Sequence, residues 1–308
     1  MPFPDGILVV NKPTGPTSHD IVAVTRRALR GQAGKPKVGH TGTLDPLASG
    51  VLPLVLGKAT RLAQFLSAAD KEYEADVELG VRTTTLDRGG TIVERARTRE
   101  VADVTAALVD EAVAAFRGTY LQMPPDYSAK KIDGDRAYDL ARRSTPVRLQ
   151  PVSVTALALD VLEWQGARLR LRLVCSAGYY VRSLAEALGE RLGTGAHLAG
   201  LVRTRSGDFT MEHAIGLDVV AHRPSEAAAR VIPLADLLPG LPAVRLTAEG
   251  ASMAARGCVI SPAHVSGNEP LPQSGRVRLL NSEGRLVAIA EPGAGRDAGF
   301  LHPGVVLE

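Results

Sequence analysis

The chain contains little cysteine and no long apolar run. Cys175 and Cys258 are its two cysteines and stand far apart, so we expect neither a disulfide framework nor a zinc site, as in a protein of the reducing cytosol. No apolar run reaches the roughly 18 residues that a membrane-spanning helix requires. The first residues lack a basic segment followed by a long apolar one, so we expect no secretory signal and a cytoplasmic location.

Cofactor and metal motifs are also missing from the sequence. The stretch GVLPLVLGKAT superficially suggests a phosphate-binding loop, but six residues separate Gly50 from Gly57, too many for a P-loop, and Ala59 stands where Ser or Thr would bind magnesium. The absence of G-x-G-x-x-G after a strand and of G-x-S-x-G argues against a dinucleotide site and a serine hydrolase. The seven histidines form no pair four residues apart. We therefore expect no cofactor and no metal.

The composition is that of a folded protein with an uneven charge. Hydrophobic residues make up 45% of the 308, which is enough for one large domain and one small one. The net charge is only +3, yet over residues 1–69 Lys and Arg outnumber Asp and Glu by eight to three. Such a basic region suits a polyanionic partner, although on charge alone a solvated helix surface is the simpler interpretation.

Hydrophobic periodicity predicts both strands and helices, with hairpins dominant and no sustained strand–helix–strand alternation. Thr17 and Asp20 form a predicted capping box that opens a helix through about Arg30. Residues 152–163 and 167–176 alternate and are joined by WQG, which predicts an antiparallel hairpin. We also expect strands at 6–10, 51–57, 73–80 and near 276–291, helices at 58–68, 100–116, within 176–193 and at 246–257, a polar loop at 81–90, a long functional loop at 118–143, and a proline-rich connection at 222–242.

The stretch GHTGTLDPLASG, residues 39–50, is the most unusual part of the chain. Asp before Pro is common turn chemistry, and on TLDP alone a purely structural turn is the simpler interpretation of Asp45. The alternative is a functional carboxylate held on a stiff turn at the edge of a sheet. Gly39 and Gly42 would then let another backbone approach, and His40 could project from the same loop.

These residues resemble the signature of the bacterial tRNA pseudouridine-55 synthases, the TruB family. Further resembling stretches follow in order over residues 6–207: GILVVNKPTGPTSHD, KEYEADVELG, QMPPDYSAKKIDGDRAYDLAR, CSAGYYVRSLAEALG and GAHLAGLVRTRSG. The resemblance implies an α+β fold, with a catalytic domain at residues 1–235 that has a mixed, largely antiparallel sheet flanked by helices. It also implies a small, β-rich, PUA-like RNA-binding domain at residues 236–308.

The resemblance further implies isomerisation of uridine to pseudouridine at position 55 in the T-loop of tRNA, without a cofactor. Asp45 would be the nucleophile, acting through C1′, C6 or a glycal route, and Arg182 would keep it ionised. Tyr180 would lie beside C5 of the base, and Tyr179 could exchange roles with it. His40 would fill the space left by the flipped uridine, Tyr73 would stack on the uracil, and Leu201 would line its pocket. Without the resemblance, the tyrosines and Leu201 are ordinary core residues and Arg182 is a helix-surface arginine.

Basic residues elsewhere are the expected contacts to RNA phosphates: Lys12, Lys130, Lys131, Arg142 and Arg143. Thr84 departs from the family, which often has an acid there, although Asp87 is nearby in sequence. The T-stem-loop of tRNA is the expected partner, and we expect a monomer. A non-catalytic tRNA-binding or tRNA-folding module is the alternative function. A glycoside hydrolase would need a second carboxylate, and none stands out near the motif.

Overall fold

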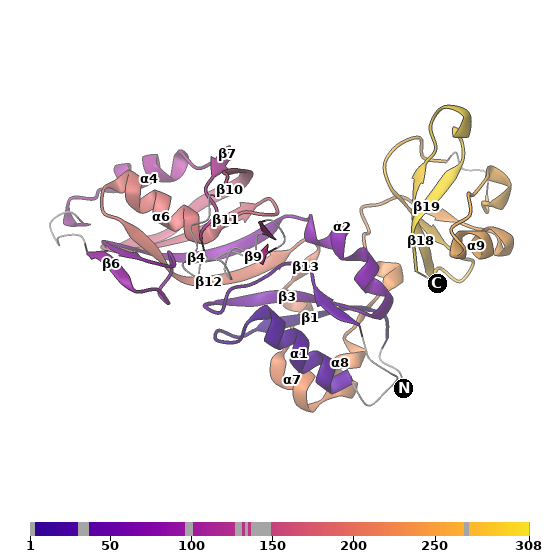
Figure 1. Ribbon diagram of the computed structural model, residues 1–308, viewed down its shortest axis with the longest axis horizontal. Coiled ribbons are helices and arrows are strands. Elements are labelled where there is room, and N and C mark those ends of the chain that lie inside the picture. Colours follow the sequence, from indigo (N-terminus) through magenta and orange to yellow (C-terminus); the bar gives the residue numbers. More distant parts are fainter. Residues whose placement is uncertain are drawn as a thin grey trace.

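The computed structural model describes residues 4–29, 37–95, 101–126, 131–132, 135–136, 149–267 and 271–307. A large mixed sheet with helices forms most of the molecule, and a smaller sheet with its own helix lies to one side of it (Figure 1). The prediction of an α+β fold with a mixed, largely antiparallel sheet flanked by helices is therefore confirmed.

The large sheet has the strand order β14-β1-β3-β12-β4-β11-β10-β7. Its pairs are antiparallel except β1 with β14 and β3 with β12, so a parallel pair lies in the middle of the sheet. Three short strands, β2, β13 and β15, pair with β3, β12 and β1. The bounds are β1 (Gly6–Lys12), β2 (Val38–His40), β3 (Ala48–Leu56), β4 (Lys71–Leu79), β7 (Gly118–Gln122), β10 (Val152–Gln165), β11 (Arg168–Cys175), β12 (Ala196–Ser206), β13 (Phe209–Thr210), β14 (Ile215–Gly216) and β15 (Ile232–Pro233).

One face of the large sheet carries the main core. Its apolar side chains and those of the helices form a single buried cluster, which spans both ends of the sheet. Figure 1 shows α4 and α6 over one end and α1, α7 and α8 over the other. The helices are α1 (Ser18–Leu29), α4 (Ala106–Ala114), α6 (Val181–Leu192), α7 (Leu217–His222) and α8 (Pro224–Ala229). Helices that cover the two ends of one face leave the middle of the sheet for a site.

The opposite face is covered only in part. The η1 (Gly57–Leu62) and α2 (Ala63–Ser67) turns and the smaller sheet pack on β1 and β3 around a second core cluster. The smaller sheet has the order β16-β17-β18-β19, and α9 packs on it around a third cluster. These elements are β16 (Ala243–Arg245), β17 (Val277–Leu280), β18 (Leu286–Pro292), β19 (Leu301–Val306) and α9 (Ala248–Ala255).

Local chemistry accounts for several of these elements. The Thr17 amide donates to the Asp20 carboxylate, and the Asp20 amide donates to the Thr17 hydroxyl, so the predicted capping box of α1 is confirmed. Strand β4 alternates strictly, with Tyr73 on the buried side and acids on the other. On the outer side the acid Glu74 pairs with Arg170 of β11. Cross-strand charge pairs thus let this part of the sheet face water.

Several predictions about elements need correction. The loop at 81–90 contains β5 (Val81–Thr83), which pairs with β6 (Ile92–Arg95). The hairpin turns at Gly166, whose positive φ suits a tight turn, and not at Trp164, which still pairs with Leu169. The helix at 58–68 divides into η1 and α2, and the connection at 222–242 contains α8 because Pro224 suits a first helical position. The helix at 100–116 is interrupted at residues 103–105, and α4 begins after its cap, Thr105.

The remaining short elements are β8 (Lys131–Ile132), β9 (Asp135–Arg136), η2 (Met211–His213), η3 (Leu234–Asp236), η4 (Pro262–His264) and η5 (Gly295–Asp297). Within the described residues, no helix has the length and apolar character needed to cross a membrane.

Candidate active site

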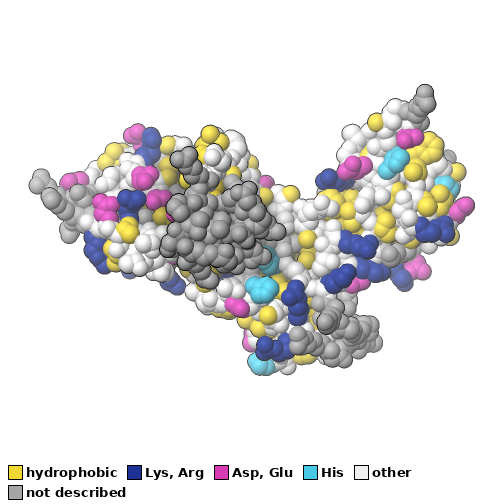
Figure 2. Space-filling model, in the orientation of Figure 1, with side chains coloured by type: hydrophobic (Ala, Val, Ile, Leu, Met, Phe, Trp, Pro, Cys, Tyr) yellow, Lys and Arg dark blue, Asp and Glu magenta, His cyan; other side chains and the backbone are white. Residues whose placement is uncertain are grey.

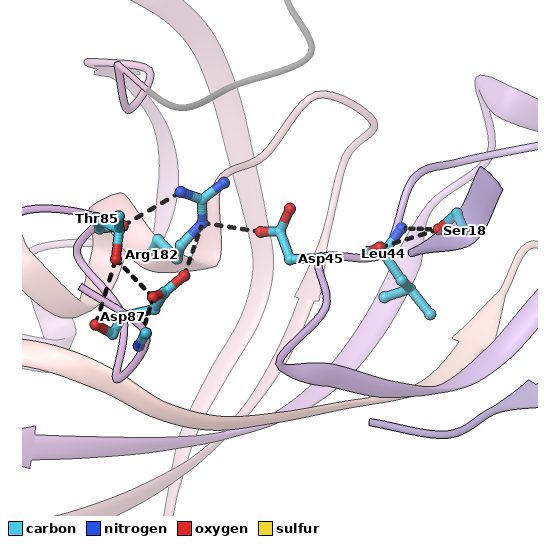
Figure 3. Close-up of polar contacts among 7 residues, drawn as sticks. Ser18, Leu44, Asp45, Thr85, Asp87 and Arg182 are labelled. Atoms are coloured by element: carbon cyan, nitrogen blue, oxygen red, sulfur yellow. Dashed lines mark hydrogen bonds and ion pairs between the residues drawn. The ribbon is translucent and has the colours of Figure 1, made fainter. Parts of the chain in front are cut away.

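Asp45 lies on a turn between β2 and β3 that is held from two sides (Figure 3). The Ala48 amide donates to the Asp45 carbonyl at 3.0 Å and closes the turn. The Ser18 hydroxyl, at the start of α1, accepts from the Leu44 amide at 2.8 Å and donates to the Leu44 carbonyl at 2.9 Å. The Gly15 amide donates to the carbonyl of residue 46 at 2.8 Å. The carboxylate therefore projects from a backbone with little freedom to move.

Arg182 meets this carboxylate from the first turn of α6. Its Nε lies 2.8 Å from Oδ2 of Asp45 and 3.9 Å from Oδ2 of Asp87, and its Nη1 donates to the Thr85 carbonyl at 3.2 Å (Figure 3). The Arg182 side chain is only 7% exposed and that of Asp45 is 34% exposed. The ion pair stabilises the negative charge of Asp45 while leaving part of the carboxylate open. A surface position for Arg182 is thereby excluded.

Asp87 is the second carboxylate at this guanidinium, which sequence reasoning did not place near the motif. Its Oδ1 accepts from the Thr85 hydroxyl at 2.6 Å and from the Gly89 amide at 2.9 Å. Leu86, between Thr85 and Asp87 in the chain, has φ of +62°, a left-handed conformation that is strained for leucine. A local turn signal is present in TLDRGG, but it does not reveal that this turn packs against α6.

A cavity of about 390 Å³ opens beside Asp45 and Arg182. This volume lies in the range of small-molecule sites and is large enough for one nucleobase. Five of the predicted site residues meet here: Asp45, Tyr73, Tyr180, Arg182 and Leu201. They come from the β2–β3 turn, β4, the residue before α6, α6 itself and β12. The cavity thus lies where the centre of the sheet is left open by the helices.

The two neighbouring tyrosines differ in their surroundings. The Tyr179 and Tyr120 hydroxyls lie 2.6 Å apart, and burial raises the pKa of Tyr179. The backbone amide and carbonyl of Tyr180 both bond to the Gln122 side chain, at 2.8 and 3.0 Å. The Tyr180 hydroxyl has no hydrogen bond to another described residue. Of these two tyrosines, Tyr180 is therefore the one whose hydroxyl is available in the cavity.

Two buried cations, Lys71 and Arg203, also line the cavity and were not found from the sequence. Lys71 donates to the carbonyls of Ser67 and Ala69, and burial lowers its pKa to about 8, with Arg203 adding to the shift. Burial raises the pKa of Tyr73, and Arg203 opposes that rise. Charged residues inside a sheet give no periodic signal, so only the structure shows them.

The prediction that Lys12 binds an RNA phosphate is corrected. Lys12 is 0% exposed, and its Nζ donates to the carbonyls of Ala48 at 2.6 Å and Pro13 at 3.0 Å. Burial lowers the pKa of Lys12 to about 8, and the Asp45 carboxylate opposes this shift. Lys12 therefore supports the end of the Asp45 turn from inside the protein.

The remaining predicted residues lie elsewhere. His40 ends β2, and its Nδ1 accepts from the Gly42 amide at 3.3 Å, but it is not among the residues that line the cavity. Lys130, Arg142 and Arg143 fall outside the described residues, as does the side chain of Lys131. Among the described residues, no three His, Cys, Asp or Glu side chains gather as metal ligands.

Comparisons with known proteins match almost the entire chain. Residues 26–181 match the TruB family pseudouridylate synthase N-terminal domain, and residues 182–238 match the tRNA pseudouridylate synthase B C-terminal domain. The tRNA pseudouridine synthase B of Solibacter usitatus is 40% identical over 98% of this chain and 100% of its own length. That of Burkholderia mallei is 41% identical over 94% of each. This chain belongs to the TruB family of pseudouridylate synthases.

Solved structures agree with membership of the TruB family. A chain from a Cbf5-Nop10-Gar1 complex has a TM-score of 0.73 and 28% identity, with coverage of 100% of this chain and 86% of its own. A chain from an H/ACA RNP bound to a substrate RNA containing 2′-deoxyuridine has a TM-score of 0.72 and 26% identity, covering 98% of this chain and 85% of its own. The predictions of the family and of an isomerase are confirmed.

Proposed function

We propose that this TruB-family chain converts uridine 55 in the T-loop of tRNA to pseudouridine, with Asp45 as the nucleophile acting on a flipped-out uridine. The observation that carries this proposal is the 2.8 Å ion pair between Asp45 and Arg182 on a pinned turn at the edge of a cavity of nucleobase size. The naming of relatives 40% identical over the whole chain as tRNA pseudouridine synthase B supports tRNA as the substrate.

The reaction rearranges bonds within one nucleotide. The bond from N1 of uracil to C1′ of the ribose breaks, the base turns, and C5 bonds to C1′. The proton on C5 is then lost and N1 gains one, so the product is an isomer of the substrate. A carboxylate nucleophile assists the break and is released when the new bond forms, which is the role we assign to Asp45 beside its guanidinium partner.

The other cavity residues would receive the base once it leaves the RNA stack, at a cost of a few kcal/mol. Tyr73 would stack on the uracil, Leu201 would line its edge, and the Tyr180 hydroxyl would lie near C5 and its departing proton. His40, which lies two positions before Gly42 of the cavity lining, would occupy the space that the base vacates. Phosphate contacts are assigned to Lys130, Lys131, Arg142 and Arg143.

The wider organisation follows from the same assignment. Residues 1–235 form the catalytic domain, and residues 236–308 form a PUA-like RNA-binding domain. The four-stranded sheet with its separate core supports this division. We assign the protein to the cytoplasm. We also assign it as a monomer, and sedimentation of the purified chain with and without tRNA tests this oligomeric state.

Site mapping of pseudouridine on unmodified tRNA, by carbodiimide labelling, tests the activity. The wild-type chain should modify uridine 55 alone, and Asp45→Asn should abolish product while keeping tRNA affinity within about threefold, because only the nucleophile is lost. Product formed by Asp45→Asn at the wild-type rate would exclude Asp45 as the nucleophile. Tight binding by the wild-type chain without any labelled site would favour the alternative, a non-catalytic tRNA-folding module.

A further inference from the structure

Arg203 is buried in the centre of the large sheet. It lies on β12 and is 1% exposed, and it forms no ion pair with an Asp or Glu of the described residues. Burying a cation costs several kcal/mol unless hydrogen bonds satisfy it. A well-packed apolar side chain would fill this position at lower cost, so packing alone does not account for an arginine here.

The Arg203 guanidinium binds the chain on both sides of the Asp45 turn. Its Nε donates to the Val51 carbonyl at 2.7 Å, and its Nη2 donates to the Gly42 carbonyl at 3.1 Å. Gly42 precedes Asp45 and Val51 follows it, so one planar group spans the segment that carries the nucleophile. Ser18 and Lys12 bond to positions inside this segment, at Leu44 and Ala48, and do not connect its two ends.

The contact with Gly42 is close. A Cβ placed on Gly42 would lie 3.3 Å from Nη1 of Arg203, and φ of Gly42 is +151°, which side chains rarely adopt. Arg203 also lies directly opposite Tyr73 across the pairing of β12 with β4, and it opposes the rise that burial causes in the pKa of Tyr73. Arg203 therefore links the turn with Asp45 to the strand with the proposed stacking residue.

We propose that Arg203 is a positioning residue, which fixes the 42–51 segment by bridging its two ends and so holds the Asp45 carboxylate against Arg182 and the cavity. This inference rests on the proposed function. Displacement of a reacting group by about 1 Å can reduce a rate by about 100-fold. Loss of the bridge should therefore slow the chemical step and leave RNA binding intact.

Arg278 provides a matched control in the smaller sheet. Its Nε donates to the Leu241 carbonyl at 3.1 Å and its Nη1 to the Ala235 carbonyl at 3.2 Å, so it bridges a backbone segment in the same way but outside the cavity. The variants are Arg203→Lys, Arg203→Met, Arg278→Lys and Arg278→Met in the full chain. Lysine keeps the charge but cannot bridge two carbonyls in one plane.

Single-turnover rates, tRNA dissociation constants and hydrogen exchange are measured for each variant below its unfolding temperature. Arg203→Met should lower the rate about 100-fold, Arg203→Lys should lower it less, and both should keep the dissociation constant within about threefold. Exchange should rise in residues 42–51 for the Arg203 variants and in residues 235–241 for the Arg278 variants. The Arg278 variants should keep the wild-type single-turnover rate at saturating tRNA, because Arg278 lies outside the cavity.

Other outcomes separate the two proposals. If the wild-type chain is active and its Arg203→Lys variant keeps the wild-type rate, the positioning role is overturned. Should Arg203→Met fail to fold, Arg203→Lys alone provides this test. Equal rate losses in the Arg203 and Arg278 variants would also overturn it, because they would reflect general destabilisation. A wild-type chain that leaves uridine 55 unmodified would instead reject the proposed function.

Discussion

At the scale of single residues, the Asp45 and Arg182 pair combines an accessible carboxylate with a buried guanidinium. Arg182 reaches oxygen atoms of Asp45, Asp87 and the Thr85 carbonyl, among its other contacts. These partners restrict the guanidinium to one orientation, so Asp45 meets a fixed charge and needs no rearrangement when the base arrives. Fixed charges of this kind contribute to catalysis because they cost no reorganisation during the reaction.

The substitution Arg182→Lys tests that arrangement. Lysine carries one compact ammonium group, which cannot satisfy Asp45, Asp87 and the Thr85 carbonyl from one position. We expect the single-turnover rate to fall by about 100-fold or more. The measurement is release of tritium from C5 of labelled uridine in tRNA, and a rate within about threefold of wild type would show that charge alone is enough.

Lys12 gives a pH-dependent prediction for stability. Burial lowers its pKa from 10.5 to about 8 in the folded chain, so between these values the unfolded chain binds more protons. The contribution of Lys12 to the free energy of unfolding must therefore rise with pH across this range, and it is lowest below about pH 8.

Lys12→Met removes this titration and keeps a similar volume. Urea unfolding of both proteins at about pH 7 and about pH 9.5 should show the wild type gaining stability relative to the variant at the higher pH. Comparing the two proteins cancels the contributions of Lys71, Cys175 and the tyrosines to the pH dependence, because these groups titrate in both. A difference that stays constant with pH would contradict a buried, titrating Lys12.

At the scale of elements, the parallel pairing of β3 with β12 brings the Asp45 turn to Leu201 and Arg203. Gly50 pairs with Arg203, and a Cβ on Gly50 would lie 2.2 Å from the Arg203 carbonyl oxygen. Its φ is +103°, which side chains rarely adopt, so both the close contact and the backbone conformation require glycine here. The centre of the sheet therefore depends on a close approach that no other residue permits.

Gly50→Ala should reduce the free energy of unfolding by at least ~2 kcal/mol, because it adds a backbone clash to the strain of a positive φ. Gly118→Ala is the control, since Gly118 has φ of +80° and nothing within 4 Å of an added Cβ. Chemical denaturation of both variants separates the clash from the strain. Equal losses in the two variants would show that β3 can move away from β12.

The elements that local signals define were predictable from the sequence. Strand β1 carries a continuous apolar run, the helix α1 a capping box, and strand β4 and the β10–β11 hairpin a regular alternation. Strand β12 was not predicted as a strand, since register shifts next to Leu198 and Arg203 break its alternation. The family resemblance supplied Asp45, Arg182 and the aromatic residues of the site.

The buried polar contacts of the site could not be predicted in the same way. Arg203 donates to carbonyls more than 150 residues earlier in the chain, and carbonyls carry no sequence signal. Asp87 has a recognisable turn, but its approach to Arg182 depends on how β5 and α6 pack. Lys12 was predicted to bind an RNA phosphate, and the structure places it inside, where lysine is rarely found.

At the scale of the whole molecule, the basic residues of the N-terminal region do not share one surface. Arg27 is exposed on α1, and others lie in the interior or at the junction of the two sheets. Lys12 is buried, whereas Lys58 and Arg61 of η1 are exposed beside the smaller sheet. Lys58 shares a surface groove with Arg285, and Arg61 donates to the Val306 carbonyl of β19. Figure 2 shows Lys and Arg side chains gathered on this face between the two parts of the molecule.

Such a junction offers positive charge to an RNA backbone that extends from the cavity toward the smaller sheet. Each lost phosphate contact weakens binding and reduces the slope of log affinity against log salt by about 0.7 to 0.9. Lys58→Ala should therefore lower tRNA affinity and reduce the slope by the amount expected for one lost phosphate contact. The rate at saturating tRNA should stay unchanged. Filter binding from low to high salt provides the measurement. Arg223→Ala, an equal loss of charge at a residue already paired with Asp218 and Glu226, should leave the slope unchanged. A wild-type slope for Lys58→Ala would mean that the RNA does not pass over this junction and that its basic residues serve only the contact between the two sheets.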